Sequence, residues 1–274
     1  MAIKTLSVLV AGAHPDDPEY CGGGIAYLYA QQGHRVTFLS LTNGDAGHHT
    51  LHGPALAERR RAEASAAGKV LGVEYLILDN HDGLLTPSVE VRHQVVRVIR
   101  QVRPNLIICH RPYDYHPDHR AVGQVVPDAV FAAHLINIEP DLPAIPFDRT
   151  PVVVYAWDEF QKPYPFRPDV VVDIDAAIDR KVEAIACHAC QFFDPSSPER
   201  AAEIPSDPAG RQAWLLGEWG PVLARPASLY RERLAGFYGS HRARRVQYAE
   251  SFELCEYGAP LPLAEVSQLF PFFD

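Results

Sequence analysis

The chain has 274 residues, which is long enough to bury a substantial core. Its content of 47% hydrophobic and 22% charged residues is typical of a soluble globular protein. The net charge of −9 and the lack of a Lys/Arg-rich run argue against nucleic acid as a partner. No apolar run approaches the roughly 18 residues that a membrane span needs.

Strand-like and helix-like segments alternate through the first two thirds of the sequence. We predict strands over residues 5–11, 35–41, 74–78, 105–109, 151–157 and 169–174. Helices are predicted between and after them, over residues 22–32, 54–71, 88–102, 117–134 and 175–191. Strands that are apolar throughout and alternate with helices indicate an α/β fold, with a mostly parallel sheet covered on both faces.

The last third of the chain is less regular. Residues 192–210 are rich in Pro, Ser and Asp and predict a loop, residues 211–240 are partly helical, and the tail is irregular. No repeat or long linker separates these segments from the rest. We therefore expect one domain over residues 1–274, with a core over about 5–190 and an extension over about 191–274.

Two features bear on the cellular compartment. Lys4, the apolar run Ser7-Val8-Leu9-Val10 and the following Ala-Gly-Ala imitate a signal peptide, but cleavage there would remove the first core strand. The five cysteines have irregular spacing and predict buried free thiols, including the isolated Cys187-x-x-Cys190 pair. Both observations favour a cytoplasmic protein.

Two short motifs carry the chemistry. His14-Pro15-Asp16-Asp17 follows the first predicted strand, and His116-Pro117-Asp118-His119 follows the fourth. In an open parallel sheet, ligands bind at the carboxyl ends of the strands, so both motifs fall where a site is expected. A dinucleotide-binding loop would have G-x-G-x-x-G after the first strand, but only Gly12 fits that pattern. His14 and Asp17 replace the other two glycines, and the paired carboxylates would repel a pyrophosphate.

The residue types in these motifs match an open metal site. Catalytic zinc takes three protein ligands and leaves one position for water. His14, Asp17 and one histidine of the second motif meet that count; His119 is the better choice, because it lies one turn into a helix and points back toward the strand ends. His116 and Asp16 then remain for acid–base chemistry. Taken singly, each motif could instead be a polar turn or a helix start. Other divalent transition metals suit the same donors.

This pair of motifs resembles the PIG-L/LmbE-like family of zinc-dependent N-deacetylases. Further matches extend the resemblance over about residues 5–190, namely Glu19, Leu41-Thr42-Asn43-Gly44-Asp45, Arg60-x-x-Glu63, Asp82-Gly83-Leu84 and Tyr113-Asp114-Tyr115. The resemblance implies a Rossmann-like doubly wound fold and removal of acetyl groups from N-acetylglucosamine-type sugars, giving acetate and a free amine. It also implies a homo-oligomer, a trimer or a hexamer.

The resemblance also implies a role for each motif residue. By position, His14, Asp17 and His119 would hold Zn²⁺, and Asp16 would be the general base. His116 would stabilise the oxyanion when protonated. The segment 18–22 is about one residue shorter than a common family form. The region after about residue 190 has no match, and we expect substrate choice to lie there.

Polar residues near the motifs are candidates for substrate binding or for support of the ligands: Asn43, Asp45, Arg60, Asp82, Asp114 and Asp118. Arg60 could contact a sugar hydroxyl or a phosphate, or be a surface charge. Asn43 and Asp45 could contact substrate or form a turn. A second candidate group is aromatic and could stack on a sugar or pack over the sheet: Trp157, Phe160, Tyr164 and Phe166.

The sequence therefore predicts an enzyme acting on a small amino sugar or glycoconjugate, with no nucleic acid and no membrane span. One alternative is an amidase on a larger amide, such as a thiol conjugate, which would use the same metal site. A non-catalytic binding module is the third possibility, and the complete ligand set with Asp16 argues against it.

Overall fold

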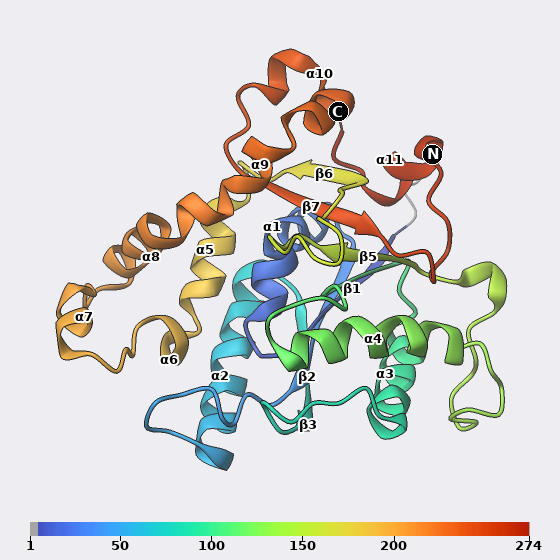
Figure 1. Cartoon of the computed structure of the whole chain (residues 1–274), viewed down its shortest axis with the longest axis horizontal. Coiled ribbons are helices and arrows are strands. Elements are labelled where there is room, and N and C mark those ends of the chain that lie inside the picture. Colours follow the sequence, from blue (N-terminus) through green and yellow to red (C-terminus); the bar gives the residue numbers. More distant parts are fainter. Residues whose placement is uncertain (1–4, 274) are drawn as a thin grey trace.

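The computed structural model describes residues 5–273 and contains a seven-stranded sheet with the order β3-β2-β1-β4-β5-β7-β6 (Figure 1). Its strands are β1 (Ser7–Gly12), β2 (Arg35–Thr42), β3 (Glu74–Asn80), β4 (Leu106–Cys109), β5 (Val152–Ala156), β6 (Val170–Asp173) and β7 (Ala249–Leu254). The five neighbouring strands β3, β2, β1, β4 and β5 pair in parallel. Strand β7 pairs antiparallel with both β5 and β6. The sheet is thus mostly parallel, as predicted.

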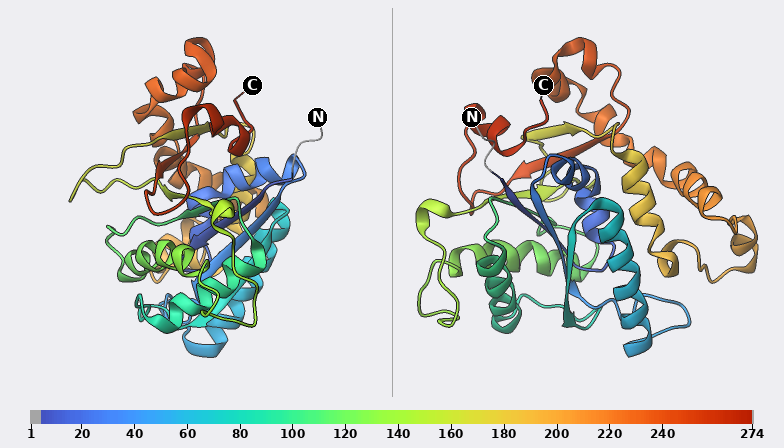
Figure 2. Two further views of the ribbon diagram at one scale, coloured as in Figure 1. Left: turned by 90° about the vertical axis from the view of Figure 1, so that its right-hand side faces the viewer. Right: turned by 180° about the vertical axis from the view of Figure 1, so that it is seen from behind.

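Helices cover both faces of the sheet (Figure 2). The helices are α1 (Asp17–Gln31), α2 (Gly53–Leu71), α3 (Val89–Val102), α4 (Pro117–Ala132), α5 (Ile178–Ala186), α6 (Ala189–Phe192), α7 (Pro198–Glu203), α8 (Pro208–Leu223), α9 (Arg225–Leu229), α10 (Arg231–Ala243) and α11 (Val266–Leu269), with short 3-10 turns at Phe147–Arg149 and Leu263–Glu265.

Each face of the central strand β1 belongs to a different hydrophobic core. Because successive side chains of a strand point to opposite faces, Val8 and Val10 pack in the core under α1, α2 and α5. Leu9 and Ala11 pack in the core under α3 and α4. This arrangement confirms the doubly wound fold expected from the sequence.

The prediction of an irregular tail was wrong for residues 249–254, which form β7 between β5 and β6. The segment Ala-Glu-Ser-Phe-Glu-Leu has no continuous apolar run, so its sequence gives little strand signal. It becomes a strand because both its edges pair with neighbours and because Lys181 neutralises the buried Glu250 at 2.6 Å.

Glu250 also accounts for an irregularity in α1. The helix departs from helical geometry at Gly22, and the amides of Gly24 and Ile25 each donate to the Glu250 carboxylate at 2.8 Å. A strand near the carboxyl end of the chain therefore holds the helix that follows the first motif.

Two further predictions of secondary structure needed correction. The helix predicted over 175–191 is divided into α5 and α6, and the loop predicted over 192–210 contains α7. Helices α6, α7 and α8 project beyond α5 on one side of the molecule (Figure 1). All five cysteines are free, as predicted. Within residues 5–273, no helix has the length and apolar character needed to cross a bilayer.

Candidate metal centre

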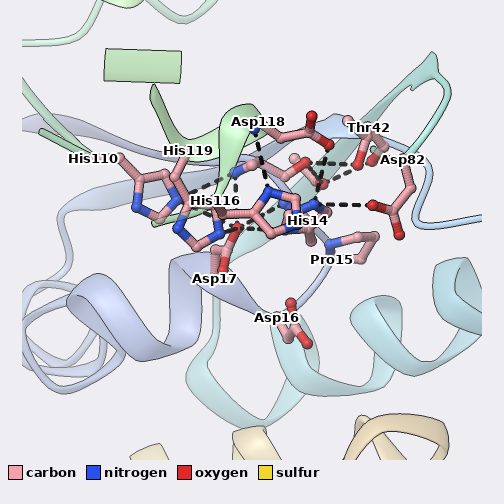
Figure 3. Close-up of polar contacts among 12 residues, drawn as sticks. His14, Pro15, Asp16, Asp17, Thr42, Asp82, His110, His116, Asp118 and His119 are labelled. Carbon is pink, nitrogen blue, oxygen red and sulfur yellow. Dashed lines mark hydrogen bonds and ion pairs between the residues drawn. The ribbon is translucent and has the colours of Figure 1, made fainter. Parts of the chain in front are cut away.

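The two motifs meet at the carboxyl ends of β1 and β4 (Figure 3). His14 lies in the turn after β1, while His116 is the N-cap of α4 and His119 lies one turn into that helix. The ring centroid of His14 lies 4.6 Å from that of His116 and 5.3 Å from that of His119. Residues about one hundred positions apart thus share one small volume.

The Asp17 carboxylate joins the two histidines that the sequence favours as ligands. Its Oδ2 atom lies 3.2 Å from Nδ1 of His14 and 3.4 Å from Nε2 of His119. The same oxygen accepts hydrogen bonds from the backbone amides of Ala13 and His14, at 2.9 and 2.7 Å. The turn after β1 therefore fixes the carboxylate in place.

In both histidines, the ring nitrogen that faces away from Asp17 contacts another carboxylate. Nε2 of His14 lies 3.1 Å from Asp82 and 3.3 Å from Asp118, and Nδ1 of His119 lies 3.2 Å from Asp114. Metal-binding histidines usually donate their second ring proton to a carboxylate in this way, which leaves the other nitrogen free to bind the ion. These contacts bring together imidazole nitrogens and carboxylate oxygens, the donor types of a divalent transition-metal site. The groups whose ligand atoms all lie within 4.8 Å of one another include His14 with His116 and His119, and Asp17 with His110 and His119.

The charges of these groups also suit a cation. Burial opposes the charged imidazolium, but hydrogen bonds to Asp118, Asp17 and Asp82 raise the pKa of His14 to about 12. Burial likewise opposes the charged form of Asp17, yet His119 and His110 hold the pKa of this carboxyl well below its usual range. The site therefore gathers several carboxylates in a buried place, which a bound cation would neutralise.

Asp16 lies apart from the histidine cluster (Figure 3) and contacts a different partner. Nη2 of Arg60 approaches Oδ2 of Asp16 at 2.9 Å and donates to the carbonyl of Pro15 at 3.3 Å. Arg60 is only 2% exposed, so it is not a surface charge. The Asp16 side chain is 21% exposed and lines the cavity described below.

His116 has one ring nitrogen engaged by its own helix. The backbone amide of Asp118 donates to Nδ1 of His116 at 3.2 Å, so the proton of the neutral ring lies on Nε2. Burial, together with the nearby charges of His14 and His119, lowers the pKa of His116.

Sequence reasoning missed His110, which directly follows β4. Its ring stacks on that of His119, with centroids 4.0 Å apart and planes 8° apart, and its Nε2 lies 3.3 Å from Oδ2 of Asp17. A histidine at the carboxyl end of a central strand was the signal that could have revealed it.

Two other predicted polar residues accept hydrogen bonds from backbone amides of residues 82–85. Asp118 accepts the amides of Gly83 and Leu85, at 2.7 and 3.2 Å, besides contacting His14. Asp45 accepts the amide of Asp82 at 3.0 Å.

Asn43 forms a turn, with its side chain accepting the Asp45 amide at 3.1 Å and donating to Asp79 at 2.9 Å. Asn43, Asp45 and Asp82 are buried and do not line the cavity.

A cavity of about 470 Å³ opens beside the metal-ligand candidates. Asp16, Asp17, Asp114 and His119 are among the residues that line it. Its volume lies within the range of about 300–1,000 Å³ that holds small-molecule ligands in proteins.

The model of the family "PIG-L: GlcNAc-PI de-N-acetylase" matches residues 9–130. The diacetylchitobiose deacetylase of Thermococcus kodakarensis is 32% identical over 239 residues, which cover 84% of this chain and 79% of that protein. A 4-oxalmesaconate hydratase of Pseudomonas putida is 28% identical over 196 residues, covering 68% of this chain and 74% of the hydratase.

Among solved structures, the N,N'-diacetylchitobiose deacetylase from Pyrococcus horikoshii in complex with its inhibitor MPG is 26% identical. It superposes with a TM-score of 0.69 over 91% of this chain and 84% of that one. The likeness to both chitobiose deacetylases extends well beyond residue 130, where the family model ends.

Proposed function

Because this chain belongs to the PIG-L family of GlcNAc-PI de-N-acetylases, we propose that it removes the acetyl group from an N-acetylated amino sugar of the N-acetylglucosamine type. The products are acetate and the free amine. The observation that carries the proposal is the contact of Asp17 with both His14 and His119, beside a cavity that Asp16 also lines. That arrangement supplies a metal-ligand set and a separate carboxylate base at one place.

We propose that His14, Asp17 and His119 hold a divalent ion, with zinc as the first candidate. When bound, such an ion supplies Lewis-acid chemistry, which polarises a carbonyl and makes water a stronger acid. The carboxylates of Asp118, Asp82 and Asp114 orient the two histidines toward the ion.

The remaining residues move protons and stabilise charge. Asp16, oriented by Arg60, takes a proton from the water that attacks the acetyl carbon. A carbon–oxygen bond forms, and the Nε2–H of His116 donates to the developing oxyanion. The carbon–nitrogen bond then breaks, and the proton held by Asp16 passes to the departing amine. This role needs only the Nε2 proton of His116, which the neutral ring and the protonated form implied by the resemblance both carry.

The hydratase relative suggests a second candidate function, addition of water to an unsaturated carboxylate. The lining of the cavity argues against it. Among the described lining residues, Arg111 is the one Lys or Arg side chain, and Asp158 neutralises it at 2.6 Å. Apart from a bound metal ion, a carboxylate substrate would meet acidic groups without a free cationic side chain.

The test is acetate release from a panel of N-acetylated sugars, with and without a chelator. We expect activity that a chelator abolishes and zinc restores. Asp16→Asn should retain metal but lose about 10²–10⁴-fold in kcat, the usual contribution of a general base. Asp128→Asn, at an exposed position of α4, is the matched control. Chelator-resistant activity, or full activity in Asp16→Asn, would refute the mechanism. Release of a larger acid in place of acetate would favour the amidase alternative.

We also propose that the enzyme is cytoplasmic. The segment that imitates a signal peptide contains β1, an interior strand of the sheet, which is buried along its whole length. Cleavage after Ala13 would remove the strand on which both cores are built.

A further inference from the structure

Six aromatic side chains line the cavity, from segments widely separated in the sequence: Tyr20, Tyr115, Trp157, Phe160, Phe192 and Trp219. Tyr115 lies beside the metal-ligand candidates, with its ring centroid 5.7 Å from that of His119. We call the part bounded by Tyr20, Phe192 and the exposed Trp219 the outer cavity. Of the four aromatic residues that the sequence offered either for stacking on a sugar or for packing over the sheet, Trp157 and Phe160 line the cavity, and Tyr164 and Phe166 do not. Phe192 and Trp219 come from the extension after residue 190, in α6 and α8, which no motif assigned to the site.

Trp219 is held in place without being covered. Its ring makes edge-on contacts with Tyr20 and Phe192, at centroid distances of 6.1 and 5.6 Å and interplanar angles of 79° and 80°. The residue nevertheless remains 38% exposed. An immobilised, accessible indole ring is a suitable surface for stacking a ligand ring.

The chain that carries Phe192 is attached to the core next to the first motif. The amide of Cys190 donates to the carboxylate of Glu63 at 3.1 Å, and the side-chain amide of Gln191 donates to the carbonyl of Gly47 at 2.9 Å. The aromatic wall therefore keeps a fixed position relative to the catalytic residues.

A further contact fastens the same segment. Asp194 lies 3.2 Å from Nε2 of His48 and 3.2 Å from Nη1 of Arg59. Nδ1 of His48 accepts the amide of Leu51 at 3.0 Å, so the Nε2 proton points at Asp194. The contacts of Asp194 with His48 and Arg59 therefore attach this segment to the core. The residue types of the group are also those of metal sites.

The charges on the outer wall are already paired. The Arg111 guanidinium, which is fully buried, makes two bonds of 2.6 Å to Asp158. Glu159 pairs with Arg225. An anionic group entering this region would lose hydration without gaining a free cation, whereas an uncharged ring would gain apolar contacts.

We propose that the outer cavity binds a neutral ring attached to the amino sugar, stacked against Trp219, so that the natural substrate carries a sugar or aromatic ring there rather than an acid. This inference rests on the proposed deacetylation, which places the acetamido group at the metal centre. The extension after residue 190 is then the part of the chain that selects the aglycone.

The experiment compares three substrates by acetate release: N-acetylglucosamine, its phenyl glycoside, and its glycoside with lactic acid. We expect kcat/KM to be highest for the phenyl glycoside and lowest for the lactate glycoside. In Trp219→Ala, the ratio of kcat/KM for phenyl glycoside to that for free sugar should fall about two- to tenfold, the size of one aromatic contact. Activity on free N-acetylglucosamine should fall less than activity on the phenyl glycoside.

Trp214→Ala is the matched control, because Trp214 lies on the same helix, packs against Phe193 and does not line the cavity. Trp219→Phe should keep most of the preference for the ring. A Trp219→Ala variant that loses activity equally on all three substrates, or a wild type that prefers the lactate glycoside, would overturn the proposal.

Binding distinguishes this inference from the proposed reaction. Calorimetry with the phenyl glycoside compares Asp16→Asn with the Asp16→Asn/Trp219→Ala double variant, in which we expect weaker binding. If binding depends on Trp219 but the wild type releases acetate from no sugar, the stacking site stands and deacetylation fails. If acetate is released but neither binding nor the substrate ratio depends on Trp219, deacetylation stands and the stacking site fails.

Discussion

Arg60 offers the sharpest test of how the site works, because its position distinguishes two roles. The sequence allowed a contact with a sugar hydroxyl or a phosphate. In the structure the guanidinium is buried and reaches Asp16 at 2.9 Å. Two glycines make room for it: a Cβ atom on Gly44 would lie 2.6 Å from the Cδ atom of Arg60, and one on Gly47 would lie 3.1 Å from its Nη1. We predict that Arg60 positions the base and does not bind the sugar.

Arg60→Met keeps much of the length of the side chain and removes the charge and the hydrogen bonds. A hydrogen bond to a charged group contributes about 1.5–3 kcal/mol, which corresponds to roughly ten- to hundredfold in rate. Since the Asp16 side chain is 21% exposed and water can replace part of the contact, we expect a loss near tenfold in kcat. Arg60→Lys should recover only part of it, because an ammonium group lacks the planar fork of guanidinium.

The assay is steady-state acetate release, with zinc affinity measured separately by competition with a chelator. Arg61→Met is the matched control, because Arg61 is the next residue of α2 and is exposed. A double-mutant cycle with Asp16→Asn tests the coupling. If Arg60 acts through Asp16, the double variant should be no slower than Asp16→Asn alone.

Three results would refute this reasoning. An Arg60→Met variant with normal kcat would show that the ion pair does not position the base. Losses that multiply in the double variant would show that the two residues act separately. A rise in KM with unchanged kcat would restore the sugar-contact interpretation.

Two further predictions concern residues that the motifs did not reveal. His110→Ala should weaken zinc affinity by about 10–100-fold, because the His110 ring buttresses His119 at 4.0 Å; His134→Ala, at another buried histidine, should leave it unchanged. Glu250→Gln should lower the free energy of unfolding in urea by about 3–5 kcal/mol, because it leaves Lys181 buried without its partner. A loss under about 1 kcal/mol would show that this pair does not stabilise the fold, and adding Lys181→Met should recover part of a larger loss.

Much of the fold could be predicted because its signals are local. The apolar strands at the centre of the sheet and the periodic helices between them each follow from short runs of sequence. Residues 35–41 and 54–71, for example, were predicted within one residue of β2 and α2 at each end. The prediction for the tail was wrong because β7 depends on two neighbouring strands and on Lys181. This lysine lies 69 residues from Glu250, its partner in β7.

The sequence by itself determined which residue types stand at the two strand ends, and hence that imidazole and carboxylate donors would meet at one sheet edge. The sequence could not show which other residues contact those donors. The burial of a side chain and the direction in which it points depend on how the whole chain packs. Only the tertiary structure turned Arg60 inward to Asp16, stacked His110 on His119 and brought Trp219 to the cavity from α8. The contacts of Arg60 and Trp219 join segments that are far apart along the chain, and all three contacts exist only after the two cores have formed.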